Sequence, residues 1–233
     1  MRKLGLIGGI GPEATIPYYH DIVYGVQQKL NRPFFPQLTI ESLSCFEVIP
    51  MSAEGRYEEL KEYLLGGIRN LAAAGADFGA LTCNTAHIVF DELKAESPIP
   101  LISIVDVTLA EAQRLGVKKA GLLGTAATMR EDFFRKPFEQ AGVEIAIPTE
   151  IEMDAVAQKI LDELELGIVR PETVKLFCDV VDRMVEEDQI EAVILGCTEI
   201  PLVFQGVELP VKRLDTMEIH IRALVEEILK EEN

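Results

Sequence analysis

Two cysteines lie at matching positions of a repeated motif, and they are the residues of this sequence best suited to chemistry. Ala80-Leu-Thr-Cys-Asn-Thr85 is echoed by Ile194-Leu-Gly-Cys-Thr-Glu199 about half a chain length later, which pairs Cys83 with Cys197. A single free cysteine is commonly just a small buried apolar residue, and we interpret the other two cysteines of the chain in that way. Two cysteines at equivalent positions of a repeat instead indicate a shared function.

Each of these cysteines follows an apolar run typical of a β-strand and precedes small polar residues. In parallel α/β sheets, ligands bind beyond the carboxyl ends of the strands. A turn into a helix N-terminus would supply N–H donors for a carboxylate and lower the pKa of the thiol, favouring the thiolate. Two such thiols on opposite faces of a substrate suit removal of a proton from carbon on one side and its return on the other. Nearby N–H groups would stabilise the enolate-like intermediate.

Short apolar runs alternate with longer helical patterns along the chain, as expected for parallel strands covered on both faces. Two further motifs repeat in the same order: Gly5-Leu-Ile-Gly-Gly9 matches Gly121-Leu-Leu-Gly-Thr125, and Ile99-Pro-Leu-Ile102 matches Leu209-Pro-Val-Lys212. This collinear repetition predicts an internal duplication of an α/β unit. The predicted strands are Lys3–Ile7, Gln37–Leu43, Phe78–Thr82, Leu101–Ile104, Ala120–Leu123, Val143–Ile147, Ala192–Leu195 and Val211–Leu214.

Two helix starts carry a capping signal. Thr128–Glu131 and Thr149–Glu152 both fit the pattern in which a threonine caps the helix and a glutamate three residues later reaches back to it. We therefore predict a helix N-terminus at each of the two threonines.

The glycine-rich segment Gly9-Ile-Gly11-Pro-Glu-Ala14 follows the first predicted strand and is similar to a dinucleotide-binding fingerprint. However, Pro12 and Glu13 would set a rigid ring and a negative charge against a pyrophosphate. We interpret the segment as a tight turn whose backbone approaches a small ligand.

The composition excludes several classes of protein. The chain has 233 residues, 48% of them hydrophobic, with 39 Asp and Glu against 22 Lys and Arg, a formal net charge of −17 and a pI near 4.6. Such an acidic chain repels nucleic-acid phosphates and anionic membranes, and no apolar run reaches the roughly 18–20 residues of a membrane span. Four cysteines with no C-x-x-C spacing fit neither a disulfide framework nor a zinc signature. We expect a cytoplasmic protein with no nucleic-acid, membrane or metal partner.

Three motifs resemble those of the aspartate/glutamate racemase superfamily of cofactor-independent amino-acid racemases, and its aspartate racemase branch most of all. The motifs are Gly8-Gly9-Ile-Gly11-Pro12-Glu13-Ala14-Thr15, Cys83-Asn84-Thr85-Ala86-His87 and Gly196-Cys197-Thr198-Glu199. Their order and spacing match those of the family, and the resemblance extends over essentially the whole chain.

The resemblance implies two similar α/β domains, each a four-stranded parallel sheet flanked by helices, related by a pseudo-twofold axis. We place the first domain at residues 1–98 plus 210–233 and the second at 99–209, with the active site in the cleft between them. A helix near Met217–Lys230 would pack back on the first domain. The family is commonly dimeric, so a homodimer is expected.

The resemblance also implies roles for individual residues. Cys83 and Cys197 would be the two bases, facing the D- and the L-enantiomer respectively, with no pyridoxal phosphate, other cofactor or metal. The residues expected to bind the substrate's α-carboxylate are Ile10, Gly11, Asn84, Thr85 and Thr128, with Thr125 and Thr198 as further candidates. His87 and Glu199 would tune the two thiols.

Recognition of an acidic side chain is where this sequence departs from the family pattern. Some aspartate racemases hold the distal carboxylate with an Arg in the loop after the second strand and a Lys on the helix after the sixth. Here the loop reads Cys45-Phe-Glu-Val-Ile-Pro-Met-Ser52 and the helix position reads Leu164-Glu165-Leu166, so neither cation is present. Arg56 or Arg130 would have to supply the positive charge.

We therefore predict an isomerase that racemises a small-molecule amino-acid substrate, aspartate first and glutamate next, by two-cysteine, two-base proton transfer. One alternative is a broad-specificity amino-acid racemase. Another is a different carbon-acid enzyme of the superfamily, namely a hydantoin racemase, a maleate isomerase or an arylmalonate decarboxylase. An alternative of another class is a non-catalytic amino-acid-binding protein.

Overall fold

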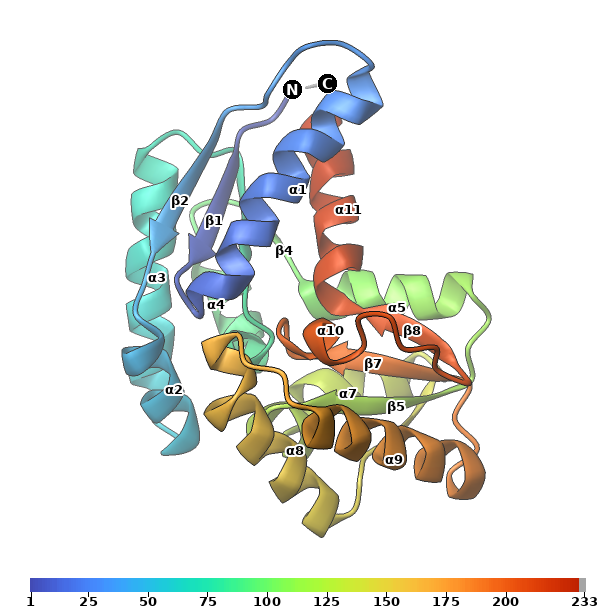
Figure 1. Ribbon diagram of the computed structural model, residues 1–233. Helices are drawn as coiled ribbons and strands as arrows, with labels where there is room; N and C mark the ends of the chain where they lie inside the picture. The colour runs from blue at the N-terminus through green and yellow to red at the C-terminus, as the bar shows by residue number, and fades with distance from the viewer. Residues whose placement is uncertain (231–233) are drawn as a thin grey trace. The chain divides into compact units, whose positions relative to one another are not determined.

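The computed structural model describes residues 1–230. Within this part of the chain there are two four-stranded parallel sheets, with strand orders β2-β1-β3-β4 and β6-β5-β7-β8 (Figure 1). The chain divides into two compact units, the first comprising Met1–Val107 and the segment from Met217 onward, and the second Thr108–Thr216.

The first sheet and its helices come from both ends of the chain. These elements are β1 (Leu4–Gly8), α1 (Pro12–Leu30), β2 (Leu38–Ser42), α2 (Cys45–Ala53), α3 (Tyr57–Ala73), β3 (Phe78–Leu81), the 3₁₀ helix η1 (Thr85–Val89), α4 (Phe90–Glu96), β4 (Leu101–Ile102) and α11 (Thr216–Leu229). The second sheet and its helices are continuous in sequence. They are α5 (Ile104–Arg114), β5 (Lys119–Gly124), α6 (Ala126–Arg130), α7 (Asp132–Gln140), β6 (Glu144–Ala146), α8 (Glu150–Asp162), the 3₁₀ helix η2 (Leu164–Leu166), α9 (Pro171–Glu187), β7 (Ala192–Gly196), α10 (Ile200–Val203) and β8 (Lys212–Asp215).

The predicted fold class and all eight predicted strands are confirmed, each strand within two residues of its predicted bounds. The internal repeat corresponds to the topology: the two glycine motifs fall on β1 and β5, and the two cysteine motifs on the ends of β3 and β7. The two units divide the chain later than the predicted split into 1–98 plus 210–233 and 99–209. The reason is that β4 pairs with β3 and β8 pairs with β7. Strand β4 therefore belongs to the first sheet, and β8 belongs to the second.

Helices cover both faces of the first sheet. On one face α1 and α11 run side by side (Figure 1) and bury Tyr18 and Leu224 against Leu6 of β1. On the other face α2 and α3 pack on Ile7 and Leu81. Neighbouring strand residues point to opposite faces, which is why Leu6 and Ile7 enter different clusters. The prediction that the C-terminal helix packs on the first domain is therefore confirmed.

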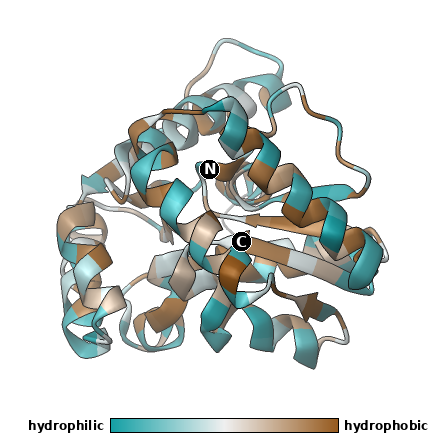
Figure 2. Cartoon of the chain, turned by 60° about the horizontal axis from the view of Figure 1, so that its bottom comes forward, coloured by the Kyte–Doolittle hydropathy of each residue, from teal (hydrophilic) through white to brown (hydrophobic). Residues whose placement is uncertain are grey.

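One face of the second sheet is buried against two helices. Helices α8 and α9 contribute Val156 and Phe177 to a cluster that contains Leu123 of β5 and Leu195 of β7. Each large apolar side chain buried in this way contributes roughly 1.5–3 kcal/mol relative to its exposed state. The helices accordingly carry both apolar and polar residues, whereas the strands are largely apolar (Figure 2).

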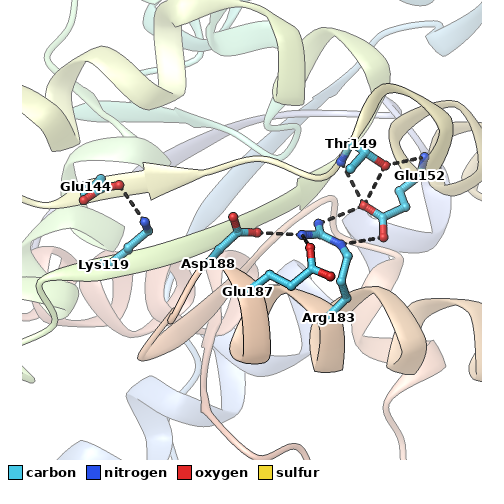
Figure 3. A network of polar contacts seen from close by, with 7 residues as sticks. All are labelled: Lys119, Glu144, Thr149, Glu152, Arg183, Glu187 and Asp188. Atoms are coloured by element: carbon cyan, nitrogen blue, oxygen red, sulfur yellow. Dashed lines mark hydrogen bonds and ion pairs between the residues drawn. The ribbon is translucent and has the colours of Figure 1, made fainter.

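Polar contacts fix the start of α8 (Figure 3). The Thr149 side chain accepts a hydrogen bond from the Glu152 backbone N–H, and the Glu152 carboxylate accepts one from the Thr149 N–H, as the capping pattern predicts. Arg183 of α9 binds both oxygens of Glu152, at 2.7 and 2.8 Å, and reaches Asp188 at 2.8 Å. The carboxylate that caps α8 therefore also ties it to α9.

The second capping prediction, at Thr128, is wrong. Thr128 lies inside α6, whose cap is Thr125; the Thr125 hydroxyl oxygen accepts a hydrogen bond from the Thr128 N–H at 3.3 Å. Glu131 then occupies the N-cap position of the next helix, α7, without a capping hydrogen bond from its side chain. None of the helices formed by residues 1–230 is long and apolar enough to cross a membrane.

Candidate active site

The first candidate base, Cys83, lies in the turn that follows β3. The N–H and hydroxyl of Thr82 both donate to the Ile7 carbonyl, at 3.0 and 3.1 Å, and so tie the end of β3 to β1. Cys83 is half-buried at the edge of the apolar cluster that also holds Ile10 and Ala86. Within the first unit, the structure therefore brings together Cys83 and the glycine-rich turn that the sequence nominated.

That turn requires glycine. Gly9 has a φ of +82°, and a Cβ there would lie 2.1 Å from the Leu43 carbonyl oxygen. The Gly9 N–H donates to the Thr15 hydroxyl at 2.9 Å, and the same hydroxyl donates to the Gly11 carbonyl at 3.1 Å. Ile10 and Gly11 are buried between these contacts, so α1 starts at Pro12 from a fixed backbone.

His87 holds the Cys83 turn through the backbone rather than through sulfur. Its Nε2 accepts a hydrogen bond from the Ile104 N–H at 3.2 Å, so Nδ1 carries the proton and donates to the Cys83 carbonyl at 2.9 Å. The ring stacks on Phe90 at 4.7 Å. Burial lowers the pKa of His87 to about 4, although its hydrogen bond to Cys83 acts in the opposite direction. His87 is therefore a neutral positioning residue and has no ring nitrogen left for a metal.

Asn84 and Thr85 follow Cys83 directly. Asn84 is buried and Thr85, the first residue of η1, is half-buried. The 3₁₀ helix η1 runs for five residues before α4 begins. The helix N-terminus expected beside the first thiol is thus that of a five-residue 3₁₀ helix.

The second candidate base, Cys197, is surrounded differently. It is buried after β7, and its Sγ donates a hydrogen bond to Oε2 of Glu199 at 2.9 Å, an oxygen that also accepts from the Thr198 hydroxyl at 2.8 Å. Burial, together with the charges of Glu199 and Glu165, raises the pKa of Cys197 well above its ordinary value. The expected lowering of the thiol pKa is therefore reversed at this position. The helix that follows, α10, has only four residues, and its N-terminal field does not offset two carboxyl groups.

Thr125 and Thr128 lie close to the Cys197 turn. Their hydroxyl oxygens are 3.1 Å apart, and Thr128 is fully buried. A Cβ on Gly196 would approach Cγ2 of Thr128 to 3.1 Å, so Thr128 packs directly against the residue before Cys197. Within the second unit, the structure therefore brings Thr125, Thr128, Cys197, Thr198 and Glu199 together.

Glu165 is the residue that the sequence reasoning passed over. It belongs to η2, and one of its carboxylate oxygens, one of Glu199 and Sγ of Cys197 all lie within 4.8 Å of one another. Burial and the charge of Glu199 raise the pKa of Glu165 to about 7. The signal in the sequence was an acidic residue at the position where the family resemblance implies a lysine in some aspartate racemases. Within residues 1–230 this is the one group of three acidic, thiol or imidazole side chains spaced so that it could hold a metal ion.

The two arginines nominated to bind a distal carboxylate already bind carboxylates of this chain. Arg56 pairs with Glu54 at 2.8 Å and Glu59 at 3.0 Å. Arg130 pairs with Glu150 at 2.9 Å and Asp154 at 2.7 Å. Each guanidinium is therefore already paired with two carboxylates of this chain.

Comparison with known proteins assigns the chain to a family. A family model described as Asp/Glu/Hydantoin racemase matches residues 7–224. The chain is 25% identical over 221 residues to the broad specificity amino-acid racemase RacX of Bacillus subtilis, covering 91% of this chain and 92% of the relative.

Two solved structures are similar over nearly their whole length. One is a candidate Asp/Glu racemase from Yersinia pestis, with a TM-score of 0.90 and 32% identity, covering 99% of this chain and 100% of the other. The second is an aspartate racemase homologue from Pyrococcus horikoshii OT3, with a TM-score of 0.82, 35% identity and the same coverage.

Proposed function

The chain belongs to the Asp/Glu/Hydantoin racemase family, and from that premise we propose that it is a cofactor-independent amino-acid racemase whose two bases are Cys83 and Cys197. The observation that carries the proposal is the equivalence of the two cysteine turns. Cys83 follows β3 and Cys197 follows β7, and these strands hold the same place in two sheets of identical order. Ligands of parallel α/β sheets bind at such strand ends.

The proposed reaction removes a proton from one face of the α-carbon and adds a proton to the opposite face. In one direction the Cys83 thiolate takes the α-proton, and the electron pair of the broken C–H bond delocalises onto the α-carboxylate. Cys197 then gives its S–H proton to the opposite face, which leaves a thiolate at Cys197 and a thiol at Cys83. The reverse reaction exchanges these roles, so the mechanism requires both thiols to reach one substrate.

The environment of Cys197 suits the donor half of this cycle. Its pKa lies well above the ordinary value because of burial and two neighbouring carboxyl groups, so the resting group is the thiol. Starting from this resting state, the reverse reaction requires the Cys83 thiolate to take a proton from solvent and Cys197 to lose its proton, and Oε2 of Glu199 lies 2.9 Å from Sγ to accept the latter. We propose Glu199 as the group that exchanges protons with Cys197.

The α-carboxylate is proposed to bind to the two turns themselves. Asn84 and Thr85 follow Cys83, while Thr128 packs beside the Cys197 turn. The backbone at Ile10 and Gly11 would complete the set. Clustered N–H and hydroxyl donors at this position would stabilise the negative charge that develops on the carboxylate as the α-proton leaves.

For the side chain of the substrate, the broad-specificity alternative has more support than aspartate or glutamate. Arg56 and Arg130, the cations nominated for a distal carboxylate, are each bound to two acidic residues. In addition, a relative that aligns with 91% of this chain is named a broad specificity amino-acid racemase.

Exchange in D₂O tests the proposal. We expect the purified protein to incorporate α-deuterium into L-amino acids of a panel that includes aspartate, glutamate, alanine, methionine and lysine, with loss of optical rotation. Cys83→Ala and Cys197→Ala should each abolish racemisation, whereas Cys45→Ala and Cys178→Ala serve as matched controls that retain it. Full racemisation by both Cys83→Ala and Cys197→Ala would remove the two-base proposal. A covalent adduct of maleate on Cys83, with no exchange into any amino acid, would assign the site to addition chemistry instead.

A further inference from the structure

Two carboxyl groups flank the sulfur of Cys197. One oxygen of Glu165 and one of Glu199 lie within 4.8 Å of each other and of Sγ. A proton transfer between Sγ and an α-carbon requires the two atoms to come within hydrogen-bonding reach. A substrate in that position is therefore close to both carboxyl groups.

This carboxyl pair has no cation supplied by the protein. Within residues 1–230, no Lys, Arg or His forms an ion pair with Glu165 or Glu199, and Oε1 of Glu199 is buried with no hydrogen-bond partner. A buried acceptor without a donor costs free energy. The unpartnered oxygen therefore points to a donor that comes from outside the chain.

Glu163, two positions before Glu165, is a useful comparison because its carboxylate has cationic and hydroxyl partners within the protein. It accepts hydrogen bonds from Lys159, at 2.5 Å, and from the Thr173 hydroxyl, and Arg170 lies at 3.5 Å. These contacts lower the pKa of Glu163, whereas burial and Glu199 raise the pKa of Glu165 to about 7. A positive group placed beside Glu165 would favour its ionised form, as Lys159 does for Glu163.

We propose that Glu165, together with Glu199, binds the positively charged end of the substrate's side chain, so that the enzyme prefers amino acids with a terminal ammonium or guanidinium group. The proposal rests on the proposed function, because it requires Cys197 to act on the α-carbon. An aspartate or glutamate substrate would instead bring a third carboxylate to the pair. Arg56 and Arg130, the cations considered for that carboxylate, are already paired.

Matched substrates measure the preference directly. Lysine and norleucine have side chains of similar length and differ in the terminal charge, and glutamate carries the opposite charge. We expect kcat/KM for racemisation of lysine to exceed that of norleucine by about tenfold or more, with glutamate the poorest of the three. EDTA in all assays removes any metal ion from the Glu165–Cys197–Glu199 group.

Substitutions at Glu165 then locate the preference. Glu165→Gln should bring the lysine-to-norleucine ratio close to one, and Glu165→Lys should make glutamate better than lysine. Glu163→Gln and the exposed Glu172→Gln are the matched controls, and both should keep the ratio of the unmodified enzyme.

Three results would overturn the proposal. The first is an unmodified enzyme that racemises norleucine or glutamate as well as lysine, a readout that needs no variant to fold. The second is an equal loss for all substrates in Glu165→Gln, which would place the α-ammonium group at Glu165. In both cases racemisation itself persists, so the proposed function stands. The third, no racemisation of any amino acid, would overturn both proposals.

Discussion

The turns that carry Cys83 and Cys197 occupy equivalent places in two sheets of the same topology, yet their surroundings differ in charge. Beside Cys83, a neutral imidazole holds the backbone through the Cys83 carbonyl. Beside Cys197, two carboxyl groups approach the sulfur itself. The duplicated fold places the two thiols alike, and the side chains around each turn, from η2 as well as from the residues after β7, raise the pKa of the Cys197 thiol.

Removing the thiols one at a time should have the largest effect. General acid–base groups contribute roughly 10²–10⁴-fold to rate, and we expect a loss of that order in racemisation for Cys83→Ala and Cys197→Ala. The resemblance places Cys83 on the D-side, so Cys197→Ala should still exchange the α-proton of the D-enantiomer in D₂O, and Cys83→Ala that of the L-enantiomer. NMR of each enantiomer separately measures this. Identical exchange patterns in the two variants would erase the distinction between the turns.

Glu199→Gln should reduce the difference in charge between the surroundings of Cys197 and those of Cys83. Removing the charge next to Sγ lowers the pKa of Cys197, although burial keeps it above the ordinary value. In a background where the other three cysteines are alanine, iodoacetamide should alkylate the Glu199→Gln variant faster at pH 8, because a lower pKa raises the fraction of thiolate. In the enzyme that keeps all four cysteines, Glu199→Gln should slow racemisation that starts from the L-enantiomer. An unchanged alkylation rate would show that Glu199 does not set the protonation of Cys197.

The buried imidazole of His87, beside the Cys83 turn, should make the stability of the protein depend on pH. The folded-state pKa of His87 is about 4, below its unfolded value of about 6.5, so the unfolded chain binds the proton first. Stability is therefore full above pH 6.5 and is lost as the pH falls toward 4, by on the order of 3 kcal/mol for this one group. Urea unfolding at pH 7.0, 5.5 and 4.5 measures the loss.

The same series on His87→Gln isolates the contribution of this ring. The variant should be less sensitive to acid than the unmodified protein, although His220, whose pKa burial lowers to about 3, continues to contribute. Equal acid sensitivity of the two proteins would mean that His87 does not carry the effect.

We expect the smallest effect from a change at the start of α8. This change tests whether the group formed by Glu165, Cys197 and Glu199 depends on the packing of α8 in the second unit. Thr149→Ala removes the cap of α8 and should destabilise the protein by about 1 kcal/mol. Because Arg183 still holds Glu152, the helix should stay in place, and kcat/KM should change less than twofold. A large loss of activity at unchanged stability would link this cap to the cluster.

The sequence predicted what depends on patterns along the chain. Buried parallel strands are continuous apolar runs, so all eight could be located, and the repeat identified Cys83 and Cys197 as a pair. The segment Cys45–Ser52, interpreted as a loop from the sequence, lies in helix α2 (Cys45–Ala53), which contains Pro50. Thr128 fits the capping pattern but lies inside α6, because Thr125, three residues earlier, is the N-cap of that short helix.

The charge around Cys197 could not be predicted because it depends on contacts across the fold. Glu165 lies on η2, which follows α8, whereas Cys197 and Glu199 follow β7. The position of Glu165 was noted only for the lysine it lacks. That its carboxyl lies beside the thiol, and that this thiol is therefore protonated, follows only once η2 and β7 are placed in one unit.

The placement of α11 has a consequence for the order in which the protein is made. The second unit is one continuous segment, whereas the first sheet needs α11 to cover the face that bears Leu6 and Phe78. During synthesis from the N-terminus, Thr108–Thr216 has left the ribosome before α11 does. The unit that begins first is therefore completed last, because the α11 side chains that pack on Leu6 and Phe78 are synthesised after the whole second unit.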